Sequence, residues 1–153
     1  MLEKALILAA KAHTGQVDKG GAPYILHPIR VMLACEGEKE KIVALLHDTL
    51  EDTALTAADL RRAGFSEEIV QAVCCLTRGQ KEDYMEYIAR ICENALAARV
   101  KYADLQDNLD IRRIPNPTER DFARIRKYEQ AMKRITRSVK GGREHGALDT
   151  GEL

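Results

Sequence analysis

The residues best suited to chemistry lie in one short apolar segment, which carries an imidazole and three carboxylates. His47, Asp48, Glu51 and Asp52 share one side of a helical wheel, and apolar residues fill the opposite side. Lys and Arg are absent from residues 42 to 60. Carboxylates crowded on a mostly buried helix repel one another unless a cation lies among them. The segment therefore predicts a divalent-metal site, although a surface helix with its acids in water is the alternative.

A second candidate element is the helix predicted over residues 95 to 112. Lys101, Asp104, Asn108 and Arg112 follow one another at i, i+3, i+7 and i+11, which places a cation, a carboxylate, an amide and a second cation along one stripe. Such a mixture suits phosphate and ribose ligands. A solvated face with ordinary ion pairs explains this helix, taken alone, equally well.

A glycine-rich loop, residues 14 to 23, comes before Tyr24 and His27. Its glycines let the backbone approach a ligand, and Lys19 offers a cation that could meet a phosphate. Pro28 is predicted at a first helical position, which places His27 at the mouth of that helix. Most such loops are only turns, and a lone His at a helix start is more often a cap than a ligand. The His-Asp pair one helix later makes a ligand role for His27 the stronger interpretation.

The elements that position these residues are all predicted to be helices. Apolar spacing and capping residues place them at about 2–13, 28–35, 38–52, 56–64, 66–76, 82–94, 95–112 and 117–138. No pattern typical of β-strands or of a repeat is present. We therefore predict an all-α fold, a compact single-domain helical bundle over residues 1 to 138. Residues 139 to 153 are glycine-rich without apolar periodicity and are predicted to be a disordered tail.

Length and composition narrow the function classes. The chain has 153 residues, enough for one domain with a real core, and its 24 Lys and Arg balance its 24 Asp and Glu. This balance argues against a general attraction to nucleic acid or membrane. The sequence has no secretory signal and no apolar run long enough to span a membrane, so we expect a cytoplasmic protein. Its four cysteines lack Cys-x-x-Cys spacing, which favours reduced core residues over a zinc-thiolate site.

Taken together, the candidate residues resemble a known family. His27, His47-Asp48 and Asp104 follow the ligand order of the HD superfamily of metal-dependent phosphohydrolases. The longer matches resemble the hydrolase domain of RelA/SpoT-type proteins, including small stand-alone alarmone hydrolases. They are Ala12-His-x-Gly-Gln16, Lys19-x-Gly21-x-Pro-Tyr-Ile-x-His-Pro28, Leu45-Leu-His-Asp-x-x-Glu-Asp52 and Lys101-x-Ala-Asp104-x-x-x-Asn108. The similarity runs from about residue 5 to about residue 135, and no synthetase domain follows.

The resemblance implies one bound Mn²⁺, a metal that accepts mixed imidazole and carboxylate ligands. The residues that match the family's metal ligands are His27, His47, Asp48 and Asp104. Glu51 and Asp52 match the acidic pair that positions and deprotonates the attacking water. The implied reaction removes the 3′-diphosphate of ppGpp or pppGpp and gives GDP or GTP plus pyrophosphate.

The same matching implies substrate contacts. Lys19 would meet a phosphate, Tyr24 would line the nucleoside pocket, and Asn108 would contact the ribose or its phosphates. We add Lys101 and Arg112 to the candidate substrate-binding residues because of their place on the charged stripe.

Two positions depart from the family pattern. The family usually has Arg before the loop Lys, where its guanidinium lies against the guanine base, and this chain has Asp18. The family tends to have Arg or Lys after the helix Asp, and this chain has Leu105. The residues for metal binding and hydrolysis therefore match the family, whereas those that recognise the base and phosphates are altered. The sequence predicts the reaction class better than it predicts the substrate.

Three hypotheses follow for the function. The first is an Mn²⁺-dependent pyrophosphohydrolase of guanosine alarmones, and the second is the same chemistry on another phosphorylated nucleotide or dinucleotide. The third is a non-catalytic metal-binding regulatory module. The presence of Glu51 and Asp52 argues against the third hypothesis, because a structural metal site would need only the four ligands.

Overall fold

The computed structural model describes residues 1 to 146, with side chains through residue 142. Its helices are α1 (Leu2–Ala12), α2 (Leu26–Leu33), α3 (Glu38–Leu46), α4 (Thr49–Asp52), α5 (Ala57–Arg62), α6 (Glu67–Cys75), α7 (Tyr84–Ile91), α8 (Ala95–Asn108) and α9 (Glu119–Gly146), with a 3₁₀ turn at Ile111–Arg113. Over this range the only strand-like pairing is a single bridge between Val17 and Pro23. The prediction of an all-α bundle is confirmed.

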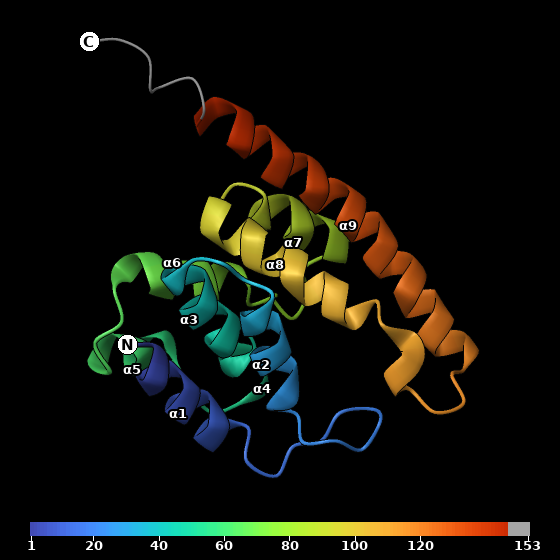
Figure 1. Cartoon of the computed structure of the whole chain (residues 1–153), viewed down its shortest axis with the longest axis horizontal. Helices are drawn as coiled ribbons and strands as arrows, with labels where there is room; N and C mark the ends of the chain where they lie inside the picture. The colour runs from blue at the N-terminus through green and yellow to red at the C-terminus, as the bar shows by residue number, and fades with distance from the viewer. Residues whose placement is uncertain (147–153) are drawn as a thin grey trace.

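Helix α3 lies at the centre of the bundle. It packs against α1, α2, α6 and α8, and α9 lies along α8 on the opposite side of the molecule (Figure 1). Residues 42 to 46 are buried without interruption, because neighbouring helices cover α3 on every side. This central position holds the end of α3, where His47 follows, at a fixed place in the fold.

The predicted helix over residues 38 to 52 is broken at His47 and Asp48. His47 Nδ1 lies 2.6 Å from the carbonyl oxygen of Ala44, and Thr49 Oγ1 donates to the carbonyl of Leu46 at 2.7 Å. These side chains satisfy carbonyls that a continuous helix would pair with backbone N–H groups. The chain therefore turns after His47 and starts α4 at Thr49, a change that apolar spacing did not indicate.

The helix predicted over residues 95 to 112 ends earlier, at Asn108. Asp110 then accepts a hydrogen bond from the backbone N–H of Arg112 and starts the 3₁₀ turn. Arg112 consequently leaves the stripe on which the sequence placed it.

The last helix is longer than predicted. It runs from Glu119 to Gly146, so residues 139 to 146 are helical where the sequence predicted a disordered tail. The rest of that predicted tail, residues 147 to 153, lies outside the described residues. Near the start of α9, Asp121 accepts hydrogen bonds from the backbone and hydroxyl of Thr118.

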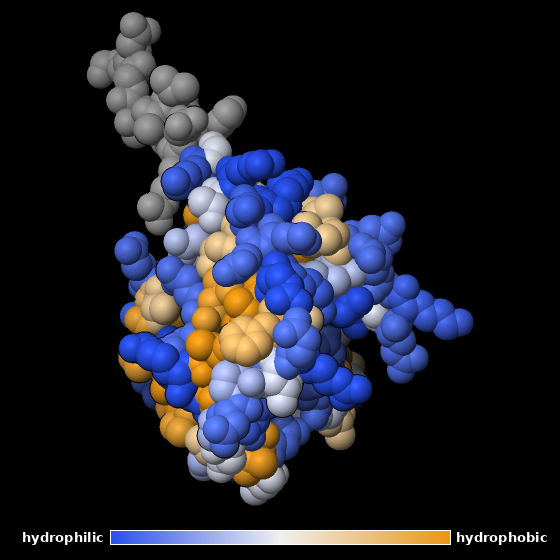
Figure 2. Space-filling model, turned by 90° about the vertical axis from the view of Figure 1, so that its right-hand side faces the viewer, coloured by the Kyte–Doolittle hydropathy of each residue, from blue (hydrophilic) through white to orange (hydrophobic). Residues whose placement is uncertain are grey.

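Apolar side chains are gathered mainly in the interior of the molecule. On the face shown in Figure 2, hydrophilic side chains surround a narrow run of apolar ones. In the part of the chain that the structure describes, no helix combines the length and the apolar character needed to cross a membrane.

Leu105 explains one departure from the family pattern. Its side chain is fully buried in the core, directly after Asp104 on α8. Leu105→Arg should therefore destabilise the protein by at least about 3 kcal/mol, because an unpaired charge would enter the core. Urea unfolding would measure the loss. Gln106→Arg, at the exposed neighbouring position, is the control, and equal stability of the two variants would contradict this account.

Candidate active site

The four predicted metal ligands converge from three places in the chain. His27 lies in the first turn of α2, His47 and Asp48 form the turn between α3 and α4, and Asp104 lies on α8. His27 Nε2 is 2.9 Å from Asp104 Oδ1 and 3.7 Å from Asp48 Oδ2. His47 Nε2 is 3.0 Å from Asp48 Oδ2 and 3.4 Å from Asp104 Oδ1. Two imidazole nitrogens and two carboxylate oxygens therefore face a common point.

This donor set fits a divalent metal ion. The carbonyl of Ala44 can only accept a hydrogen bond, so His47 Nδ1 carries a proton and Nε2 is the ring atom that faces the cluster and could bind a metal. That Nε2 atom is buried and has no hydrogen-bond partner among the described residues. Burial opposes protonation of His47, but the carboxylates of Asp48 and Asp104 outweigh it and raise the pKa of the imidazole well above its usual value. The cluster draws positive charge, which a divalent cation supplies.

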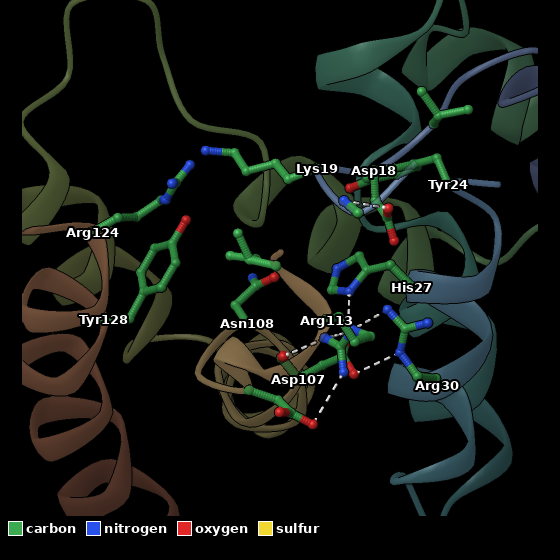
Figure 3. Close-up of a pocket in the computed structure, with 14 residues that line it drawn as sticks. Asp18, Lys19, Tyr24, His27, Arg30, Asp107, Asn108, Arg113, Arg124 and Tyr128 are labelled. Atoms are coloured by element: carbon green, nitrogen blue, oxygen red, sulfur yellow. Dashed lines mark hydrogen bonds and ion pairs between the residues drawn. The ribbon is translucent and has the colours of Figure 1, made fainter. Parts of the chain in front are cut away.

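Asp107 orients the other imidazole. Its Oδ2 lies 2.7 Å from His27 Nδ1, so His27 also turns Nε2 toward the cluster. Arg30 donates two hydrogen bonds to the Asp107 carboxylate, and Arg113 lies 3.2 Å from it (Figure 3). Sequence reasoning missed Asp107, although its place one turn after Asp104 on the same helix was a usable signal.

Asp104 is held by two residues of its own helix. Lys101 Nζ donates to Asp104 Oδ2 at 2.7 Å, and Asn108 Nδ2 donates to Asp104 Oδ1 at 3.0 Å. Burial favours the neutral acid, but Lys101 and the two histidines hold the pKa of Asp104 well below its usual value. Asp104 therefore stays ionised, as a metal ligand would have to be.

The acidic pair lies on α4, beside the metal-ligand cluster. One carboxylate oxygen each from Asp48, Glu51 and Asp52 lie within 4.8 Å of one another. The backbone N–H of Arg78 donates to Glu51 Oε1 at 2.7 Å. Partial desolvation and the neighbouring carboxylates raise the pKa of both Glu51 and Asp52, which makes each a stronger base than an isolated carboxylate in water.

A short hydrogen-bonded chain ties α4 to the glycine-rich loop. Gln16 Nε2 donates to the Asp52 carbonyl at 2.9 Å, and His13 Nδ1 lies 2.7 Å from Gln16 Oε1. Tyr24 N donates to the Gln16 carbonyl, and the Tyr24 hydroxyl donates to Asp48 Oδ2. The Ala12-His-x-Gly-Gln16 motif therefore positions the acidic pair relative to the predicted ligands.

Two adjoining cavities of about 270 Å³ each open at this cluster. Tyr24, His27, Asn108 and Tyr128 line both. The first cavity, shown in Figure 3, extends between the glycine-rich loop and α9. The second contains the acidic pair.

The predicted substrate-binding residues divide between these cavities. Lys19 is exposed at the edge of the first cavity, 3.8 Å from Asp121, and Tyr24 and Asn108 line both cavities. Lys101 lines the second. Arg112 lines neither, because its guanidinium pairs with Asp110 and its side chain is 87% exposed. The structure does not bring Arg112 to the site.

Other lining residues were not foreseen from the sequence. Arg30, Arg113, Arg124 and Tyr128 line the first cavity. Figure 3 shows Arg124 and Tyr128 on α9, facing the loop that carries Lys19 across the cavity. Arg30 follows the motif residue Pro28 by two positions, whereas Arg124 and Tyr128 are separated in sequence from every motif, so only the fold reveals their proximity.

Comparison with solved structures gives a neighbour with the same fold. It carries the description "A metazoan ortholog of SpoT hydrolyzes ppGpp and plays a role in starvation responses". The TM-score is 0.72 at 27% sequence identity, and the match covers 92% of this chain and 85% of that chain.

Curated relatives agree with this neighbour. The Escherichia coli bifunctional (p)ppGpp synthase/hydrolase SpoT is 32% identical over 124 residues, which is 71% of this chain and 17% of that protein. A guanosine-3′,5′-bis(diphosphate) 3′-pyrophosphohydrolase of Aquifex aeolicus is 32% identical over 120 residues, 71% of this chain and 17% of that protein. A Myxococcus xanthus GTP pyrophosphokinase is 30% identical over 144 residues, 82% of this chain and 18% of that protein. The chain thus spans less than a fifth of the length of these relatives, and no family model matches it.

The Asp107 contact generates a prediction about metal affinity. Asp107→Asn should weaken divalent-metal binding by about tenfold or more, because the charge that orients His27 is lost. Calorimetric titration of metal-depleted protein measures the change. Asp110→Asn, which removes a carboxylate that pairs with Arg112 and Arg113 rather than with His27, is the matched control and should bind metal as the wild type does. Equal affinities for all three proteins would refute the orienting role of Asp107.

Proposed function

Because the chain has the sequence and fold of an HD-type hydrolase domain of the RelA/SpoT kind, we propose that it removes the 3′-diphosphate of guanosine alarmones. The products are GDP or GTP and pyrophosphate. The observation that carries the proposal is the meeting of His27, His47, Asp48 and Asp104 beside an acidic pair, where two cavities join. We place this nucleotide hydrolysis in the cytoplasm.

The proposed metal is Mn²⁺, held by the same four residues. Mixed imidazole and carboxylate donors suit this ion. When bound, it supplies Lewis acidity toward water and a phosphoryl oxygen, and it offsets negative charge in the transition state.

Glu51 and Asp52 do the proton chemistry in this proposal. Their carboxylates lie beside the ligand Asp48, and their raised pKa values favour acceptance of a proton from the attacking water. The Arg78 N–H holds one oxygen of Glu51, which leaves the other free to orient that water. Asp52 is fixed through its backbone by Gln16.

The first cavity suits the nucleoside. Val17 and Ile114 supply apolar wall, and the Tyr128 ring offers a face for a base. Lys19 at the rim and Asn108 at the junction are positioned to contact phosphate and ribose.

A second candidate function is the same hydrolysis on another phosphorylated nucleotide, and Asp18 favours it. Its Oδ1 accepts hydrogen bonds from the backbone N–H groups of Gly20 and Ala22, each at 2.9 Å. The side chain thus shapes the loop and cannot supply the stacking guanidinium of the family pattern. A nucleotide panel assayed with Mn²⁺, with pyrophosphate and orthophosphate measured separately, discriminates the two functions by which substrate has the higher kcat/KM.

Metal removal gives the next prediction. Chelation should abolish hydrolysis and lower Tm, because an ion at 100 times its Kd stabilises the folded state by about 2.7 kcal/mol. Added Mn²⁺ should restore both activity and Tm. Asp104→Ala is the control, since its Tm should respond little to either treatment. An Asp104→Ala protein that binds Mn²⁺ as tightly as wild type would remove Asp104 from the ligand set.

Variants of the acidic pair distinguish an enzyme from a non-catalytic metal-binding module. Glu51→Gln and Asp52→Asn should each keep metal affinity while kcat falls by about 10²- to 10⁴-fold, because the amides cannot accept the proton. The double variant should lose little beyond the worse single variant, since both residues serve one water. Steady-state kinetics and metal titration of the same preparations give the answer. Wild-type rates in both single variants would show that this pair has no role in proton transfer.

A further inference from the structure

The hydroxyl group of Tyr84 has no role in the proposed hydrolysis. Tyr84 begins α7 and lines the second cavity, and it is only 9% exposed. Its hydroxyl oxygen is buried without a hydrogen-bond partner among the described residues. The hydroxyl of Tyr87, on the same helix, donates to the Leu76 carbonyl at 2.6 Å. Since an unpaired buried hydroxyl costs free energy, Tyr84 indicates an acceptor that enters the cavity.

Two cations lie against the same ring. Lys127 Nζ is 4.3 Å from the Tyr84 ring centroid, and the Arg78 guanidinium carbon is 5.4 Å from it. Both residues line the second cavity together with Lys101. Lys101 pairs with Asp104, whereas Arg78 and Lys127 form no ion pair with a carboxylate across residues 1 to 142. Partial burial and the neighbouring cations lower the pKa of Lys127, as expected where positive charges gather without an anion.

The structure assigns Arg78, Tyr84 and Lys127 to an anion subsite that binds the diphosphate group removed from the substrate. The Tyr84 hydroxyl donates a hydrogen bond to a phosphate oxygen, and the two cations neutralise its charge. This assignment rests on the proposed function for the identity of the ligand. The subsite itself rests on the unpaired hydroxyl and on two cations that lack a carboxylate partner within residues 1 to 142.

The position of the subsite fits the diphosphate group that the attacking water converts to pyrophosphate as the bond to the ribose 3′ oxygen breaks. The second cavity is also lined by Asp48, Glu51 and Asp52, so an anion held there lies beside the metal ligands and the acidic pair. Arg78 is tied directly to that pair, because its backbone N–H donates to Glu51. The same residue therefore orients a catalytic carboxylate through its backbone and offers a guanidinium to the diphosphate under attack. The apolar wall for a nucleoside is in the other cavity.

Inorganic pyrophosphate is the probe for this subsite. Its binding to the Mn²⁺-loaded protein is measured at constant free Mn²⁺, both directly by calorimetry and as product inhibition of hydrolysis. Tyr84→Phe and Lys127→Gln should each weaken pyrophosphate binding by about tenfold or more, since each removes a hydrogen bond or charge on an ionic ligand. GDP binding should change by less than about twofold. Tyr102→Phe and Lys133→Gln, on α8 and α9 outside the second cavity, are the matched controls.

The outcomes test the subsite and the proposed substrate independently of each other. Pyrophosphate affinity at the wild-type level in both variants overturns the subsite, even where alarmone hydrolysis is confirmed. Equal losses of pyrophosphate and GDP affinity also overturn it, because these residues would then hold the nucleoside portion or the fold. Selective loss of pyrophosphate affinity in a protein that does not hydrolyse ppGpp supports the subsite and refutes the proposed substrate. Thermal unfolding of each variant confirms that the comparison uses folded protein.

Discussion

The rest of the structure depends on how it buries several carboxylates and two imidazoles close together, largely shielded from water. Asp104, His27 and His47 are all buried, and Asp48 lies against them. Charges in such a place are stable only when each is paired, hydrogen-bonded or coordinated. Lys101 donates a hydrogen bond to one oxygen of Asp104, and Asp107 is hydrogen-bonded to His27. The remaining lone pairs converge, and a divalent cation is the group that satisfies them together.

This requirement explains the shape of the surrounding helices. Had α3 continued past His47, its backbone N–H groups would have taken the Ala44 and Leu46 carbonyls. Instead, His47 and Thr49 side chains occupy those carbonyls, and the chain turns inside the core. The turn directs His47 and Asp48 toward the same point and sends α4 outward, which leaves Glu51 and Asp52 exposed to solvent. The hydrogen bonds of two side chains to helix carbonyls thus separate the predicted metal ligands from the accessible acids.

Apolar periodicity was enough to predict the helices and the all-α bundle, because burial of one face per helix is a property of the sequence itself. Residue types alone grouped His47 and Asp48 with the acidic pair, and it was the resemblance to the HD superfamily that added His27 and Asp104 to the predicted ligands. The ends of elements were harder. The break at His47, the early end of α8 and the extension of α9 to Gly146 depend on side-chain hydrogen bonds or on packing that a single sequence does not display.

Residues that act from distant segments were also beyond the sequence. Arg78 follows α6, Tyr84 begins α7 and Lys127 lies on α9, and no spacing rule relates them. Asp107 could have been found, because it shares a helix and nearly a face with Asp104. Arg112 failed as a candidate for the opposite reason, since its spacing was right only for a helix that Asp110 ends.

Charge is therefore segregated within the site. Acids surround the point where His27 and His47 meet, and Arg78 and Lys127, which have no carboxylate partner among the described residues, lie against Tyr84. Opposite charges of this kind would collapse into ion pairs on a flexible surface. Here the acids and the cations are kept apart. Arg78 Nε donates to the backbone carbonyl of Glu82, and Lys127, on the long helix α9, lies over the Tyr84 ring. A ligand with an anionic end can contact a metal among the acids and the cations at Tyr84 at the same time. A phosphorylated nucleotide has such an anionic end.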